Sequence, residues 1–185
     1  MYIFKVARIA CLLSSFSAAT VTTTVTYNGI FEDVTTSVKE FACWNGKEGS
    51  LIEDQGWEDL SDLPFVIAGY EGVDGPDSPL CGTCWVLEYE GRSRPMIVID
   101  SAKSGFATDI KTMNSLTGGK ATKLGRVNVT AIQSPELFDC GIGPEPTEED
   151  LENVRGGNWY STWFYDFFQE PAYKEYSGWG NMKSK

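Results

Sequence analysis

The chain has 185 residues, among them 15 Lys or Arg, 26 Asp or Glu and no His. Without histidine, hydrolases of the Ser-His-Asp or Cys-His kind are excluded, and so are zinc sites that use His ligands. A net charge of −11, with no basic stripe in the sequence, argues against nucleic acid and anionic membranes as partners. We expect a neutral ligand or a basic protein surface as the partner, and no cofactor or metal.

Residues 1–19 predict an export signal. Lys5 and Arg8 form a positive n-region, an apolar run follows, and Ser17-Ala18-Ala19 offers small residues for cleavage before Thr20. The apolar run is far shorter than the roughly 20 residues that span a bilayer, and no other segment is apolar enough for a span. The alternative is a buried N-terminal helix. Cleavage would leave 13 basic and 26 acidic groups, a net charge of −13, on a protein that is secreted, extracellular or wall-associated.

The mature chain of about 166 residues is expected to form one main domain that is rich in β-structure. Residues 21–27 alternate β-branched side chains and predict a strand, whereas residues 44–82 predict loops with short strands. Two apolar strands, 85–89 and 94–100, flank Glu90-Gly91-Arg92. This spacing predicts a hairpin in which the glycine supplies an unusual backbone angle.

Residues 108–117 predict a helix, with Thr108 as its N-cap and Gly118-Gly119 at its end. One face of this helix carries the apolar residues Ile110, Met113 and Leu116. Residues 127–133 predict a further strand. This order of elements suits a small barrel with a helix at its side.

The composition changes after Cys140. Residues 141–146 predict a linker, and residues 147–150 predict a capping box that opens a short acidic helix. Residues 159–179 hold ten of the 24 aromatic residues of the chain. Either this segment packs on the barrel as a flap, or it forms an aromatic platform for sugar or a docking element for a partner.

Four cysteines remain after signal cleavage: Cys43, Cys81, Cys84 and Cys140. An even number in an exported chain favours disulfides, and four cysteines allow three pairings. The C-x-x-C pattern at 81–84 also fits redox proteins, which are cytosolic, and zinc ribbons, which need a second close pair. A bond between Cys81 and Cys84 would make a cramped ring. Pairing Cys43 with Cys81 and Cys84 with Cys140 would tie both ends of the domain to its centre, at roughly 4 kcal/mol per bond.

The segment 77–85, Asp-Ser-Pro-Leu-Cys-Gly-Thr-Cys-Trp, resembles the central signature of the cerato-platanin family of small secreted fungal proteins. The resemblance extends over residues 22–140, and its further motifs are Val25-Thr26-Tyr27, Ala42-Cys43-Trp44-Asn45-Gly46, Gly49-Ser50-Leu51-Ile52, Ile99-Asp100-Ser101-Ala102-Lys103-Ser104-Gly105-Phe106, Met113-Asn114-Ser115-Leu116-Thr117 and Gly125-Arg126-Val127.

This resemblance implies a mainly β fold with minor helix, a six-stranded double-ψ β-barrel over residues 20–140, followed by an aromatic-rich extension at 141–185. It implies the disulfides Cys43–Cys81 and Cys84–Cys140. It also implies binding of chitin oligomers, weak expansin-like loosening of wall polysaccharide, and recognition by host plant proteins as a defence elicitor, with little hydrolysis.

Three features depart from the family pattern. Gly75-Pro76 stands where the family often has Gly-Trp, which removes an aromatic ring that could stack on sugar. The segment 58–62 is unusually acidic. The aromatic segment after Cys140 has no counterpart in compact members of the family, so no family property extends to it.

Asp100 matches the aspartate that the barrel shares with expansins and related glycosidases. It could hold the following loop, bind sugar, or act as a general acid, and the last role needs a second carboxylate roughly 5–9.5 Å away. Asp74, Asp77 and Asp109 are possible partners. Four more residues match the family and could line a shallow sugar groove or serve as internal struts: Tyr27, Asp77, Asn114 and Arg126.

Asn128-Val129-Thr130 is an N-glycosylation sequon inside a predicted strand, so its use depends on whether Asn128 points outward. Three functional hypotheses follow. The first is non-hydrolytic binding of wall polysaccharide or chitin oligomers, with a role as elicitor. The second is a weak endo-glycosidase with Asp100 as the acid. The third is a docking or surface-active module that works through residues 141–185.

Overall fold

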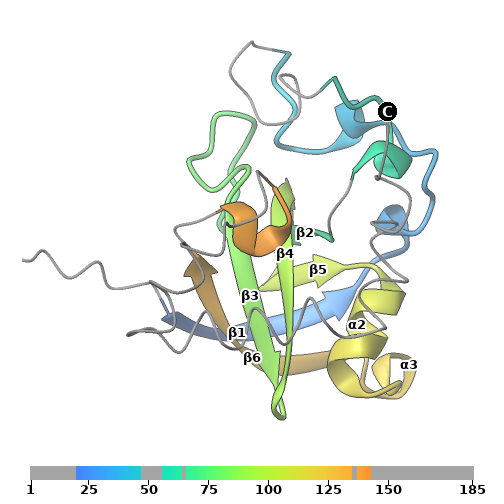
Figure 1. Ribbon diagram of the computed structural model, residues 1–185, viewed down its shortest axis with the longest axis vertical. Helices are drawn as coiled ribbons and strands as arrows, with labels where there is room; N and C mark the ends of the chain where they lie inside the picture. The colour runs from blue at the N-terminus through green and yellow to red at the C-terminus, as the bar shows by residue number, and fades with distance from the viewer. Residues whose placement is uncertain (1–19, 47–55, 64–65, 135–136, 143–185) are drawn as a thin grey trace, which may run out of the picture.

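The computed structural model describes residues 20–46, 56–63, 66–134 and 137–142 (Figure 1). Six strands close into a barrel in the order β1-β5-β2-β4-β3-β6. Their bounds are β1 Thr20–Tyr27, β2 Ile67–Tyr70, β3 Cys84–Tyr89, β4 Arg92–Ser101, β5 Phe106–Thr108 and β6 Arg126–Ser134. The predicted mainly β, six-stranded double-ψ β-barrel is confirmed.

The barrel mixes parallel and antiparallel strand pairs, and the order of the strands in the chain alone does not reveal which pairs are which. β1 pairs with β5 and β2 with β4 in parallel, whereas the other four contacts of the barrel are antiparallel. The predicted hairpin joins β3 to β4 through Glu90 and Gly91, both with positive φ, at 46° and 75°. Such a two-residue turn matches the twist of the strands it connects.

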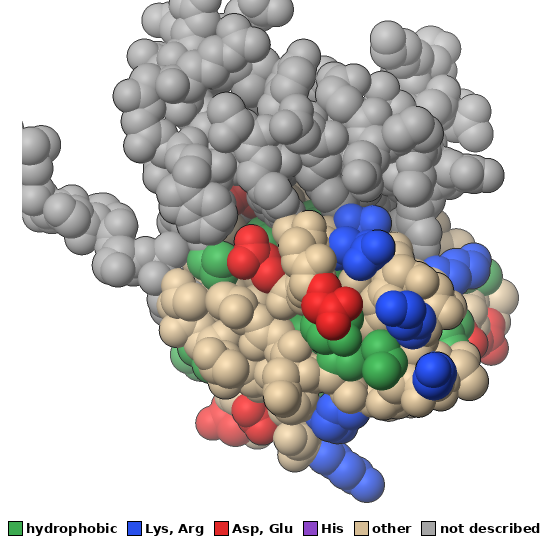
Figure 2. Space-filling view, turned by 90° about the horizontal axis from the view of Figure 1, so that it is seen from below, with side chains coloured by type: hydrophobic (Ala, Val, Ile, Leu, Met, Phe, Trp, Pro, Cys, Tyr) green, Lys and Arg blue, Asp and Glu red, His purple; other side chains and the backbone are tan. Residues whose placement is uncertain are grey.

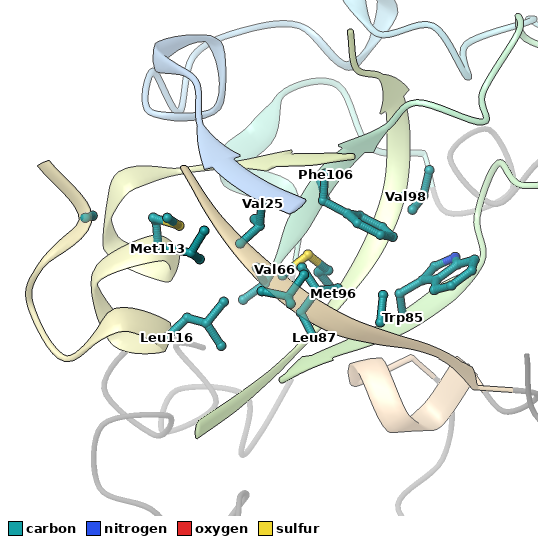
Figure 3. Close-up of a cluster of buried hydrophobic side chains, with 14 of the residues drawn as sticks. Val25, Val66, Trp85, Leu87, Met96, Val98, Phe106, Met113 and Leu116 are labelled. Carbon is teal, nitrogen blue, oxygen red and sulfur yellow. The ribbon is translucent and has the colours of Figure 1, made fainter. Parts of the chain in front are cut away.

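Apolar side chains pack on both sides of the barrel wall. Inside, one cluster includes Val25, Trp85, Leu87 and Phe106 (Figure 3). Outside, a second cluster covers the part of β4 that carries Ile97 and Ile99 with residues of the loops 30–44 and 57–63. Because both faces of this strand are buried, its sequence is a continuous apolar run rather than an alternating one.

The loops around the second cluster contain short 3-10 turns: η1 Gly29–Phe31, η2 Val38–Glu40, η3 Leu60–Asp62 and η4 Leu137–Cys140. Two short α-helices, α2 Ile110–Thr117 and α3 Ala121–Leu124, lie at the other end of the barrel (Figure 1).

The predicted N-cap Thr108 is wrong by one residue. Asp109 caps α2, and its Oδ1 accepts hydrogen bonds from the backbone N–H groups of Lys111 and Thr112. Thr108 instead ends β5, and its hydroxyl donates to the carbonyl oxygen of Ile67 over 2.8 Å. The predicted helix end is confirmed, since Gly118 takes the left-handed conformation there.

Two disulfides join Cys43 to Cys81 and Cys84 to Cys140, as predicted. No helix in the described ranges is long and apolar enough to cross a membrane. The predicted signal at 1–19, and from residue 143 onward the predicted linker, acidic helix and aromatic segment, lie outside the described residues.

Candidate functional site

The loop that follows β4 has three anchors and an exposed surface. The N–H of Ala102 donates to the Tyr70 carbonyl over 3.2 Å, and the N–H of Glu71 donates to the Gly105 carbonyl over 2.9 Å. The third anchor is Arg126, whose Nη1 donates to the carbonyl of Ser104. Side chains of Ser101, Lys103 and Ser104 remain exposed. The loop 101–105 therefore presents hydroxyl and ammonium groups on a held backbone.

Asp100 directly precedes this loop at the end of β4, and its carboxylate already accepts a hydrogen bond. Its Oδ1 accepts the backbone N–H of Ala42 over 2.8 Å, across 58 residues of sequence. The next residue along, Cys43, donates its N–H to the Ile99 carbonyl and bonds to Cys81. Asp100 thus holds the Cys43 segment against the end of β4. The sequence suggested a structural role in the following loop, whereas the observed hydrogen bond is to Ala42.

The three carboxylates considered as partners for Asp100 differ in their environment. Asp109 is buried as the cap of α2, and its Oδ2 also accepts the Thr112 hydroxyl over 2.6 Å. Asp74 and Asp77 are exposed in the loop 71–82, which the Cys43–Cys81 bond links to the segment whose Ala42 donates to Asp100. Among the described residues, no three Cys, Asp or Glu groups gather in a way that could hold a metal ion.

Arg126 begins β6 and lies on the far side of the loop from Asp100. Its Nη1 donates to the Thr24 hydroxyl over 2.7 Å and to the Ser104 carbonyl over 2.9 Å. Strand pairing places Gly69, Ala107 and Thr26 between Asp100 and Arg126. Four strand spacings amount to about 19 Å along the barrel wall. Asp100 and Arg126 therefore flank the loop and do not touch a common small ligand atom.

Asn114 and Tyr27 lie at the end of the barrel near α2, where both make structural contacts. Asn114 accepts the Ala121 N–H on Oδ1 over 3.0 Å and so joins α2 to α3. Tyr27 ends β1 and packs partly buried against the inner cluster. Both side chains contact other parts of the fold, and a role of either residue in sugar binding stays a prediction. Of the predicted set, Asp77 and Asp100 belong to segments that the Cys43–Cys81 bond links, whereas Tyr27, Asn114 and Arg126 lie toward α2 and α3.

Tyr70 is a feature of the site that the sequence analysis missed. Its ring is half-buried at the end of β2 and stacks on Phe106, with ring centroids 4.3 Å apart. Burial, with a smaller contribution from the Glu71 carboxylate, raises the pKa of the Tyr70 phenol above its ordinary value. In the sequence, Tyr70 ends an apolar run and is followed by Glu71-Gly72. This pattern could have predicted an aromatic ring at the end of a strand, on the edge of the barrel.

Asn128 lies on the outer side of β6 and pairs with Thr24 of β1. Its side chain is exposed, which is the condition that the sequon needs. Glycosylation at this asparagine stays a prediction.

The cerato-platanin family model matches residues 23–142, the span that contains the barrel strands from Thr23 onward and all four cysteines of the two disulfides. The chain belongs to the cerato-platanin family. The family resemblance predicted over residues 22–140 is therefore confirmed. Members of this family are secreted fungal proteins of the elicitor type.

One cerato-platanin relative, the allergen Asp f 15 of Aspergillus fumigatus, is 32% identical over 121 residues, which cover 64% of this chain and 77% of that protein. Cerato-platanin 3 from M. perniciosa is similar in structure, with a TM-score of 0.60 and 25% identity over 66% of this chain and all of that one. The fungal elicitor cerato-platanin has a TM-score of 0.54 and 31% identity over 63% of this chain and 95% of that one.

Proposed function

We propose that this cerato-platanin is a secreted, non-hydrolytic carbohydrate-binding protein that associates with wall polysaccharide or chitin oligomers. The observation that carries the proposal is the engagement of Asp100. Its Oδ1 accepts the backbone N–H of Ala42, which supports a structural role for the carboxylate that a glycosidase of this barrel class would use as its acid. We therefore assign sugar binding to the loop 101–105 and to Tyr70.

The chemistry around this loop suits a sugar polymer. Sugar sites combine a flat apolar face with hydrogen-bonding groups at their edge. Tyr70 supplies a half-buried ring at the end of β2, and Ser101 pairs with it in the strand register. Ser101 and Ser104 both carry exposed hydroxyls. Because Ala102, Ser104 and Gly105 are all held by hydrogen bonds, little conformational entropy is lost when a ligand binds.

The test is a titration of the full mature chain, residues 20–185, with N-acetylglucosamine oligomers, followed by NMR. We expect chemical-shift changes at residues 101–105 and at Tyr70, with no new reducing ends released from chitin or β-1,4-glucan. Glucose oligomers of the same length are the control for the sugar type. No shift change at millimolar ligand would overturn the proposal.

Release of reducing ends that is lost in Asp100→Asn would favour the glycosidase alternative instead. The third hypothesis concerns residues 141–185, nearly all outside the described residues, and a chain shortened to residues 20–142 tests it through the same titration.

A role in host recognition is a second candidate, because the solved relative of 31% identity is described as a fungal elicitor. Infiltration of the pure protein into plant leaves should then trigger an oxidative burst. Protein that has been reduced and alkylated is the control, and an equal response to both samples would count against recognition of the folded barrel by host plant proteins.

A further inference from the structure

Basic residues are unevenly distributed in this acidic protein. The segment 92–126 holds seven Lys and Arg residues, but its only carboxylates are Asp100 and Asp109. Both carboxylates accept backbone N–H groups, and Asp109 is buried. The segment thus presents an excess of positive charge, although the whole chain carries −11.

Five of these cations lie on segments that contact one another in turn, which we name the basic edge: Arg92, Lys103, Lys120, Lys123 and Arg126. The guanidinium of Arg92 reaches across to Gly118, where an added Cβ would lie 3.2 Å from its Cζ. Lys120 follows two residues later at the N-cap position of α3, and Lys123 lies in the last turn of that helix.

The basic edge continues from α3 to the candidate sugar loop. Arg126 follows Lys123 by three residues and donates to the Ser104 carbonyl. Lys103 is the neighbour of Ser104, so the basic edge ends on the loop 101–105. Figure 2 shows Lys and Arg side chains gathered mostly along one side of the end of the molecule that carries α2 and α3.

These side chains are available to a ligand. All five residues of the basic edge are exposed. Within the described part of the chain, no carboxylate forms an ion pair with Arg92, Lys103, Lys120 or Lys123. A local excess of exposed positive charge raises the local concentration of anionic ligands.

The shape of the charge distribution favours a thin anionic chain over a broad anionic surface. Charges separated by more than the Debye length, about 8 Å at physiological salt, barely interact. Glu90 in the β3–β4 hairpin and Glu71 beside the loop 101–105 place carboxylates at the two ends of the basic edge. A linear polymer that lies along Lys120, Lys123 and Arg126 avoids them, whereas a membrane presents its charge to a wide area of the protein. Among the described residues of α2 and α3, Leu124 is the one large apolar side chain that is exposed, at 37%. This region therefore offers a membrane little apolar surface.

We propose that the basic edge binds acidic polysaccharides, that is, linear sugar polymers whose units carry carboxylates. The inference rests on the proposed function and narrows its ligand class. Uronate carboxylates would pair with the cations of Arg92, Lys120 and Lys123, while sugar units further along the polymer reach the loop 101–105. Such a ligand contradicts the expectation from net charge alone that partners are neutral or basic.

The test measures the affinity of the full mature chain for polygalacturonate by calorimetry. We expect binding in low salt that weakens by about tenfold or more when the salt rises several-fold, since counterions compete for the cations. Lys123→Glu should weaken binding several-fold, and the double variant Lys120→Glu/Lys123→Glu should weaken it further. Neutral N-acetylglucosamine oligomers should bind wild type and variants alike.

The matched control is Lys39→Glu, which makes the same change of charge on η2, where Lys39 lies 5.4 Å from the Trp44 ring centroid. It should bind polygalacturonate within about twofold of wild type. Near-UV circular dichroism verifies that each variant is folded. Equal losses in Lys39→Glu and Lys123→Glu would overturn the proposal, because general charge would then explain the binding.

Two further outcomes separate this inference from its alternatives. Loss of neutral-oligomer binding with polygalacturonate binding intact would overturn the proposed function but keep the basic edge as an anion site. Binding of single-stranded DNA or of anionic vesicles at least as tight as that of polygalacturonate would overturn the choice of a carboxylated sugar polymer.

Discussion

At Asp100, the end of β4 and the segment that carries Cys43 meet through one carboxylate oxygen. The acceptor and its donor, Ala42, are 58 residues apart in sequence. A motif can show that an aspartate stands at this position, but not which backbone group it will face. The neighbouring pair Thr108 and Asp109 shows the same limit, because either residue type can cap a helix. Pairing of β5 with β1 extends the strand through Thr108 and leaves the cap to Asp109.

Asp100→Ala should lower the free energy of unfolding by about 1–3 kcal/mol, because the Ala42 N–H loses its acceptor in a partly buried place. Asp100→Asn keeps an oxygen at the same position and should cost less. Urea denaturation of both variants measures the difference. Asp74→Ala removes an exposed aspartate and should stay within about 0.5 kcal/mol of wild type. An equal stability of Asp100→Ala and Asp74→Ala would contradict the structural role.

At the scale of elements, long patterns were more informative than short ones. The alternation in β1, the hairpin of β3 and β4, the helix α2 and the strand β6 were all predicted, because each spans enough residues to show a period or a turn signal. β5 has three residues and α3 has four, so neither carries a period. β5 forms because β1 and β2 pair with it, and α3 is joined to α2 through the Ala121 N–H, which donates to Asn114.

Gly105 shows what the contact between elements requires. Its φ of +57° is left-handed, and an added Cβ would lie 2.2 Å from the Thr24 carbonyl oxygen of β1. Gly105→Ala should therefore destabilise the protein by roughly 2–4 kcal/mol, since β1 and the loop must move apart. Thermal unfolding of Gly119→Ala gives the comparison: φ there is +81°, nothing lies within 4 Å, and only backbone strain of about 1–2 kcal/mol is expected. If the two variants unfold at the same temperature, the close approach of β1 is not a constraint.

At the scale of the whole molecule, two disulfides close loops of similar length. Their sequence separations are 38 and 56 residues, so chain entropy assigns roughly 4 kcal/mol to each. Their accessibility differs, however. Cys84 and Cys140 are buried, with exposed fractions of 0% and 2%, whereas Cys81 is only half-buried.

Under limiting reductant, the Cys43–Cys81 bond should therefore open first, because a thiolate reaches Cys81 more readily than either buried sulfur. Alkylation of the freed thiols followed by peptide mass spectrometry identifies the bond that opened. Early labelling of Cys84 and Cys140 would mean that the barrel opens at β3 before the Cys43 segment is released.

The sequence by itself determined the features that arise from neighbours along the chain: the main strands and helix, the hairpin, and, through the motif around Cys81 and Cys84, the family with its barrel and disulfide pairing. Only the tertiary structure decided which groups meet across the barrel. It engaged Asp100 with Ala42, placed Arg126 on the other flank of the loop 101–105, and brought Arg92 beside Gly118 at the end of α2. The physical reason is range: periodicity and turn preferences act over a few residues, whereas these contacts depend on the order in which six strands close.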